Sequence, residues 1–279
     1  MVRPGFWFFG GNLVTVGPGG IAGKLPELPA EMLHIQDWEG ELKAYDFAPI
    51  SMQVPTIIDV NNIYSREWSV DPDLPMDEDC LYLNVWTPAV CADEKLPVFV
   101  WYFGGGLQVG HTAEMEFDGE RIARRGIVVV TVNYRLNAFG FLSHPEITAE
   151  SPVAPANFGH LDQQSGTQWV KRNIAAFGGD PDQITIGGQS AGGGSVLSQL
   201  ASPQNEGLFQ RAVIMSGIFT PLYPNNPVPP IERTLSQAEE EGQPSLNLWE
   251  CRLWKRPASW MPSMSVIKCW STAASGERL

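Results

Sequence analysis

The sequence predicts an α/β fold with a largely parallel sheet that carries helices on both faces. Two observations favour this class. Apolar runs rich in β-branched residues recur between turn residues, and stretches with helical character lie between them. Because a strand-helix-strand connection is a right-handed crossover between parallel strands, this alternation predicts a sheet that is covered on both sides.

Five apolar runs are candidate buried strands, and each is bounded by Gly, Pro, Asn or Asp or by a short polar stretch. They cover residues 80–86, 97–103, 127–134, 183–186 and 211–215. The first two runs are joined by a link too short for a helical crossover. We therefore expect the leading edge of the sheet to be antiparallel.

Three stretches between these runs have helical character, and each is followed by a residue that ends helices. They cover residues 117–125 before Gly126, residues 161–177 before Gly178, and residues 191–201 before Pro203. Helices in these places would cover the sheet from both sides, as the fold class requires.

The chain divides into three parts by composition. Residues 1–50 are rich in Gly and Pro without clear periodicity, which predicts an irregular segment. Residues 51–247 carry the α/β pattern. Residues 248–279 hold four of the ten tryptophans, and their five basic and two acidic residues give a local charge of +3. This tail has neither strand nor helix period and is compatible with a shifted reading frame.

Charge and hydropathy exclude two classes of partner. The formal net charge is −13, so the average surface repels nucleic acid. No apolar run is long enough to span a bilayer. The four cysteines are irregularly spaced, without a metal-ligand pattern, so we expect neither a bound metal nor a cofactor. Composition leaves the oligomeric state open.

The strongest motif surrounds Ser190. Gly188-Gln189-Ser190-Ala191-Gly192 is a G-x-S-x-G that follows the fourth predicted strand and opens the helix at Ala191. In a nucleophile elbow small glycines allow so sharp a turn that the serine hydroxyl stands exposed above the sheet. The spacing and setting therefore predict Ser190 as a catalytic nucleophile, with unusual backbone angles at that residue.

A glycine loop follows the second predicted strand. Phe103-Gly104-Gly105-Gly106 lies at the carboxyl end of that strand, on the same rim of a parallel sheet as Ser190. Unobstructed glycine amides suit an oxyanion hole, which stabilises the tetrahedral intermediate of acyl transfer. A phosphate cradle is the alternative, but the sequence has no P-loop and no dinucleotide fingerprint.

Several ordered stretches resemble the type-B carboxylesterase and lipase family, which includes cholinesterases and neuroligins. The resemblance covers about residues 38–217. It is carried by Phe177-Gly178-Gly179-Asp180-Pro181 with the Ser190 motif, Glu78-Asp79-Cys80-Leu81-Tyr82-Leu83-Asn84-Val85, Asn133-Tyr134-Arg135, Phe139-Gly140-Phe141-Leu142, Asn157-Phe158-Gly159, Leu161-Asp162-Gln163 and Gly207-Leu208-Phe209.

This resemblance implies an α/β-hydrolase fold and a carboxylic ester hydrolase that forms an acyl-serine intermediate on a small-molecule ester. It assigns the oxyanion donors to the amides of Gly105, Gly106 and Ala191. It also implies a buried or half-buried ion pair between Arg135 and Asp162. A non-catalytic binding protein on the same fold, as neuroligins are, is the alternative function.

The chain departs from the family pattern at three positions. Phe103 stands where His or Tyr is usual, which leaves the backbone donors intact. Gln189 stands where Glu is common, which weakens any preference for cationic esters. Cys80 belongs to a motif whose cysteine pairs in secreted members, but the matching position is Ser51. A buried free thiol at Cys80 favours a cytoplasmic location, and secretion stays open.

The histidines make the largest departure. His34, His111, His144 and His160 all precede Ser190, whereas the hydrolase order is serine, acid, histidine. We interpret His111, which follows the glycine loop, as a loop histidine rather than a base. We therefore expect a chain truncated before the C-terminal half of the domain, unstable on its own and without ester turnover.

Overall fold

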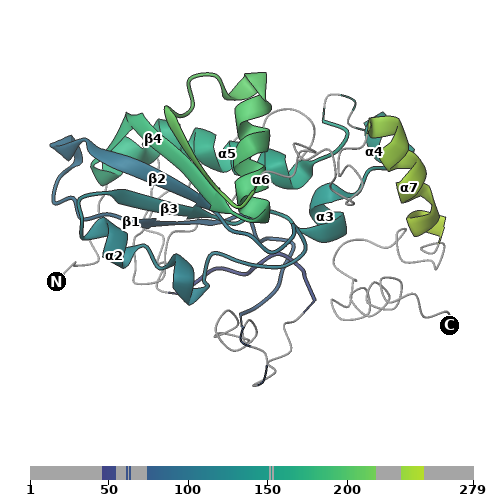
Figure 1. Cartoon of the computed structure of the whole chain (residues 1–279), viewed down its shortest axis with the longest axis horizontal. Coiled ribbons are helices and arrows are strands. Elements are labelled where there is room, and N and C mark those ends of the chain that lie inside the picture. Colours follow the sequence, from purple (N-terminus) through teal and green to yellow (C-terminus); the bar gives the residue numbers. More distant parts are fainter. Residues whose placement is uncertain are drawn as a thin grey trace.

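A computed structural model describes residues 46–54, 61, 63, 74–150, 152, 154–217 and 234–247 (Figure 1). The predictions for residues 248–279, and for most of residues 1–50, lie outside these described residues. Within them a twisted sheet forms the centre of the molecule, and α6 lies along β4 (Figure 1).

The sheet has five strands in the order β1-β3-β2-β4-β5. The strands are β1 (Leu83–Trp86), β2 (Leu96–Tyr102), β3 (Val128–Val132), β4 (Gly179–Gln189) and β5 (Arg211–Met215). β2, β3, β4 and β5 pair in parallel, whereas β1 pairs antiparallel with β3. The predicted α/β class with a largely parallel sheet is confirmed.

The leading edge is antiparallel as predicted, but the first two strands are not neighbours. β3 lies between β1 and β2. The expectation that a short link joins adjacent strands was wrong. Two strand spacings amount to about 10 Å, and an extended link of nine residues can span about 30 Å, so residues 87–95 pass one intervening strand with ease.

The described helices are α2 (Glu120–Ala123), α3 (Asn137–Phe141), α4 (Pro145–Glu150), α5 (Phe158–Asn173), α6 (Ala191–Ala201) and α7 (Leu235–Asn247), with 3-10 turns at Ala92–Glu94, Met115–Phe117, Ile174–Phe177 and Pro203–Asn205. Three of these helices have more than ten residues, and two of them, α5 and α6, pack on the same face of the sheet. α7 lies beside α4 (Figure 1), where the Thr148 hydroxyl donates to the Glu239 carboxylate at 2.5 Å.

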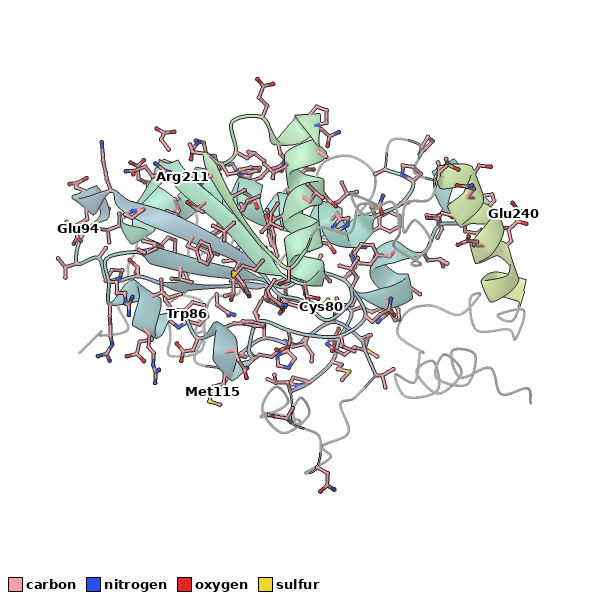
Figure 2. The ribbon with its side chains drawn as sticks, viewed as in Figure 1. Cys80, Trp86, Glu94, Met115, Arg211 and Glu240 are labelled. Atoms are coloured by element: carbon pink, nitrogen blue, oxygen red, sulfur yellow. The ribbon has the colours of Figure 1, made fainter. Side chains whose placement is uncertain are left out.

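Alternation along the strands separates two cores. Val98 and Val100 of β2 pack in the main cluster with Val170 of α5 and Val196 of α6. On the opposite face Trp86 and Val129 pack against Ala123 of α2 (Figure 2). Both faces of the sheet therefore carry helices, as the binary pattern predicted.

The predicted helix over residues 117–125 is wrong in its extent. A 3-10 turn ends at Phe117, and α2 begins only at Glu120. Asp118 between them has extended backbone (φ −61°, ψ 112°), and its carboxylate accepts the N–H of Glu120 at 2.8 Å. This local hydrogen bond between a side chain and the backbone two residues on fixes a turn that interrupts the predicted helix.

Two further features of the described residues are the exposed edge of the sheet and the character of the helices. In the described part of the chain β5 is the edge strand opposite β1, and its Val213 and Met215 side chains are exposed. None of the helices in the described ranges is long and apolar enough to cross a membrane.

Candidate active site

Ser190 lies in a strained turn between β4 and α6. Its backbone angles are φ 55° and ψ −123°, outside the regions that non-glycine residues prefer. Its N–H donates to the carbonyl of Met215 in β5 at 2.9 Å, and its carbonyl accepts the N–H of Gly194 at 3.0 Å. The predicted strain at Ser190 is confirmed, and the neighbouring strand holds it in place.

The glycine loop begins directly after β2 and turns back on itself. Gly105 has φ +103°, and a Cβ there would lie 2.0 Å from the carbonyl oxygen of Val109. That carbon cannot be accommodated, because Gly105 O accepts the N–H of both Gln108 and Val109 at 3.1 Å. A tight backbone turn therefore requires glycine at position 105.

The loop and the serine turn lie against each other. A Cβ built on Gly104 would lie 3.3 Å from the Ser190 Cβ and 2.8 Å from the Gln189 carbonyl oxygen. Gly106 is exposed and Gly105 half-buried, while Ala191 is buried at the first turn of α6. The first glycine of the loop and the positive end of an eleven-residue helix thus lie beside Ser190, where negative charge would be stabilised.

Four buried or half-buried side chains make hydrogen bonds to residues 103–112, which are the glycine loop and the residues that follow it. Sequence reasoning missed this role for all four. The Tyr134 hydroxyl donates to the Phe103 carbonyl at 2.7 Å, and the Asn133 side chain accepts the Thr112 N–H at 3.0 Å. Gln53 forms hydrogen bonds with both backbone groups of Gly110. Glu114 accepts the N–H of His111 at 3.0 Å.

Tyr134 and Asn133 fall within a family-like stretch, and that is the signal that could have found them, whereas Gln53 carries no such signal. Phe103 itself is buried and stacks on Tyr134 with ring centroids 4.3 Å apart. Its apolar side chain therefore belongs to the support of the loop.

The predicted pair between Arg135 and Asp162 is confirmed. The guanidinium donates to both carboxylate oxygens, at 2.8 Å from Nε and 2.6 Å from a terminal nitrogen. The Arg135 backbone N–H adds a third bond to the same carboxylate at 3.0 Å. Asp162 is fully buried at the start of α5, so three donors compensate its charge.

Cys80 is a free, buried thiol, as expected (Figure 2). Its pKa is raised to about 12, chiefly by burial and also by the nearby Asp162 carboxylate, while a hydrogen bond with Ser51 lowers it. Ser51 thus lies beside Cys80, where the resemblance placed it. A thiol with so high a pKa stays protonated and unreactive at neutral pH.

Two of the described histidines, His144 and His160, make side-chain contacts with partners other than Ser190. His160 Nδ1 lies 3.2 Å from the Gln163 amide oxygen, and burial lowers the pKa of its imidazole. His144 Nδ1 accepts the N–H of Glu146 at 3.2 Å. The described ranges hold no cluster of three or more His, Cys, Asp or Glu side chains suited to a metal ion.

Glu114 is the most strongly perturbed carboxyl beside the site. Its pKa is raised from 4.5 to about 7, chiefly by burial and also by the charge of Glu116, while the hydrogen bond from the His111 N–H lowers it. A folded-state pKa above the unfolded value means that folding takes up a proton between these two pH values. The Glu114 contribution to stability is therefore fully present below pH 4.5 and is lost as the pH rises to about 7.

We expect Glu114→Gln to remove this dependence, because an amide oxygen can still accept the His111 N–H. Relative to wild type, the free energy of unfolding of the variant should rise by about 1–3 kcal/mol between acidic and neutral pH. Urea unfolding of both proteins at a series of pH values measures the difference. A difference that stays flat over that range would show that Glu114 ionises as freely in the folded chain as in the unfolded one.

The chain is similar to known lipases and esterases. The sequence profile of the Carboxylesterase family matches residues 30–255. Rat bile salt-activated lipase is 45% identical over 190 residues, which cover 65% of this chain and 28% of the lipase. Fumonisin B1 esterase of Sphingopyxis macrogoltabida is 42% identical over 167 residues, covering 59% and 29%. Mouse cholinesterase is 45% identical over 180 residues, covering 64% and 29%.

The chain thus spans less than a third of the length of these curated relatives. The family match, in contrast, extends over most of the chain and includes both the glycine loop and Ser190. The mostly parallel sheet is the one that an α/β-hydrolase requires. On these grounds the chain belongs to the carboxylesterase family and has its α/β-hydrolase fold.

Proposed function

We propose that this protein is a carboxylic ester hydrolase that acts through an acyl intermediate on Ser190. The observation that carries the proposal is the strained Ser190 turn against the glycine loop, at the amino end of α6. Backbone strain is retained where function requires it. A protein that only bound a partner on this fold would have no physical need for a nucleophile beside such a loop.

In the proposed reaction the Ser190 hydroxyl oxygen attacks the ester carbonyl carbon and gives its proton to a base. The carbonyl electron pair moves to oxygen, and the amides of Gly105, Gly106 and Ala191 donate to the oxyanion. Collapse restores the carbonyl and expels the alcohol, which takes a proton. Water then hydrolyses the acyl-enzyme by the same steps.

The base is the missing component of this proposal. No histidine follows Ser190 in the sequence, and a resting serine hydroxyl is a poor nucleophile. We propose that this chain alone has a formed oxyanion site and a reactive serine position but does not turn over esters at an enzymatic rate.

The substrate class follows from the relatives and from Gln189. Bile salt-activated lipase, fumonisin B1 esterase and cholinesterase are named for ester substrates or for ester hydrolysis. The Gln189 amide oxygen lies beside Gly104, where a Cβ would approach it to 3.3 Å. Because this side chain is neutral, we propose a small uncharged ester rather than a choline ester.

The experiment is labelling of the full chain with a serine-directed fluorophosphonate, followed by peptide mass spectrometry. We expect modification at Ser190 in wild type and its loss in Ser190→Ala. Ser198→Ala is the matched control, because it removes a serine of α6 whose hydroxyl donates to the Gly194 carbonyl at 3.2 Å. This control should be labelled as wild type is.

Hydrolysis of p-nitrophenyl acetate by the same proteins distinguishes an incomplete active site, a complete one and a binding protein. Labelling without turnover above the Ser190→Ala background would support a formed site that lacks its base. Turnover that depends on Ser190 would reveal a base not yet identified. A folded chain that is neither labelled nor active would favour the binding-protein alternative.

A further inference from the structure

A short buried segment outside the predicted elements supports the glycine loop. We name residues 50–53 the strap. Each of its four residues has at most 8% of its surface exposed. Ile50 anchors its start, because the Ile50 N–H donates to the Pro75 carbonyl at 2.9 Å and the Ile50 carbonyl accepts the Asp77 N–H at 3.1 Å.

The strap is also tied to the segment that follows β3. The Ser51 hydroxyl oxygen accepts the N–H of Leu136 at 3.2 Å, and the Met52 carbonyl accepts the side-chain amide of Asn137 at 2.7 Å. Asn137 in turn donates its own backbone N–H at 2.7 Å to the carbonyl of Leu107, the residue directly after Gly106. The strap therefore reaches the loop indirectly through Asn137.

Gln53 reaches the same loop directly. Its side-chain oxygen accepts the Gly110 N–H at 2.8 Å, and its side-chain nitrogen donates to the Gly110 carbonyl at 3.1 Å. The same nitrogen donates to the Ser51 carbonyl at 3.1 Å, which orients the amide. One buried side chain, 57 residues away in sequence, thus satisfies both backbone groups of Gly110.

The connection from Gly110 to the oxyanion donors is made by one peptide plane. The Gly105 carbonyl accepts the N–H of Val109, the residue directly before Gly110. This carbonyl and the Gly106 N–H belong to the same planar trans peptide, in which they point in opposite directions. Holding the carbonyl toward Val109 therefore fixes the Gly106 N–H in the direction away from Val109, and Gly106 is exposed.

We infer that Gln53 is a positioning residue for the oxyanion site, acting through Gly110 and Val109 on the peptide that ends in the Gly106 N–H. This inference rests on the proposed function, because it gives the Gly106 amide a role in catalysis. An oxyanion donor stabilises charge only when it is fixed before the reaction, and displacement of about 1 Å costs up to a hundredfold in rate.

The test uses Gln53→Met in the full chain, because methionine retains the length of the side chain and loses both hydrogen bonds with Gly110. Gln164→Met is the matched control. Gln164 lies in α5 and is similarly buried, and its amide donates to the Asn205 side chain at 2.6 Å. Asn137→Gly is a second variant, since glycine keeps φ +47° and removes the bond to Met52.

Three quantities are measured on each protein: kinact and KI for fluorophosphonate labelling of Ser190, hydrogen exchange of residues 103–112, and Tm. For Gln53→Met we expect kinact to fall about 10- to 100-fold with KI changed less than about twofold. Exchange should rise in residues 103–112 only. Asn137→Gly should also lower kinact and raise the exchange of residues 103–112, each by a smaller factor. Gln164→Met should lower Tm without changing kinact.

A structural role alone would lower Tm in both glutamine variants and leave kinact equal to wild type, which would overturn the inference. An exchange increase spread evenly over the sheet would also overturn it. If the wild-type chain is folded but is not labelled, the proposed function fails. Hydrogen exchange in Gln53→Met then tests the structural role of Gln53 separately. A rise confined to residues 103–112 supports the role of Gln53 in fixing these residues, and no such rise refutes it.

Discussion

Asp162→Ala is expected to lower the free energy of unfolding by about 3 kcal/mol or more. Removing one partner of a buried ion pair costs about 3–5 kcal/mol, because the remaining charge is left without compensation. The Asp162 side chain is fully buried and accepts three hydrogen bonds from Arg135. We expect the lower part of that range, because the Arg135 side chain is 23% exposed and can regain some water.

Urea unfolding followed by circular dichroism measures this change, and Glu120→Ala is its control. Glu120 pairs with Arg124 one helical turn away, but the two side chains are 44% and 54% exposed. Loss of such a surface pair should cost under about 0.5 kcal/mol. If the two variants lose the same free energy of unfolding, the buried Asp162 pair stabilises the chain no more than the exposed Glu120 pair does.

Gly192→Ala is expected to abolish fluorophosphonate labelling and to destabilise the chain. A Cβ at this position would lie 2.1 Å from the carbonyl oxygen of Tyr102 and 2.6 Å from that of Phe103. Both are backbone atoms at the end of β2, so neither can rotate away. α6 must then move away from β2, and Ser190 at its amino end moves with it.

We expect this displacement to reduce the labelling rate by about a hundredfold or more, since reacting groups tolerate little misplacement. Overpacking of this kind also costs about 1–3 kcal/mol of stability. Ser198→Ala, further along the same helix, should change neither quantity appreciably. Labelling of Gly192→Ala at the wild-type rate would mean that the close approach of α6 to β2 is not needed to place Ser190.

Local features of the chain were predictable because their causes are local. The strand 211–215 and the helix 191–201 were predicted with the bounds they have, since apolar runs and a following proline mark them directly. The elbow at Ser190 was predictable for the same reason: the glycines that permit the turn lie within two residues of it. The Arg135–Asp162 pair, by contrast, was expected only from family resemblance.

The position of the second strand shows where pattern reading fails. The short link after Trp86 suggests that the two strands it joins are neighbours. In the structure, however, β3 lies beside β1. A link of that length can reach either position, so its sequence does not distinguish them. The choice depends on which strands bury the most apolar surface together, and that is a property of the whole sheet.

The amino-acid sequence by itself established the α/β class, the turn at Ser190 and the glycine loop, because spacing and residue type act within a few positions. Only the folded chain revealed that Gln53 holds Gly110 and that Glu114 is buried beside the same loop. A side-chain amide makes hydrogen bonds with whatever backbone lies within reach. Its partner is set by packing that brings distant segments together, and no local pattern records that packing.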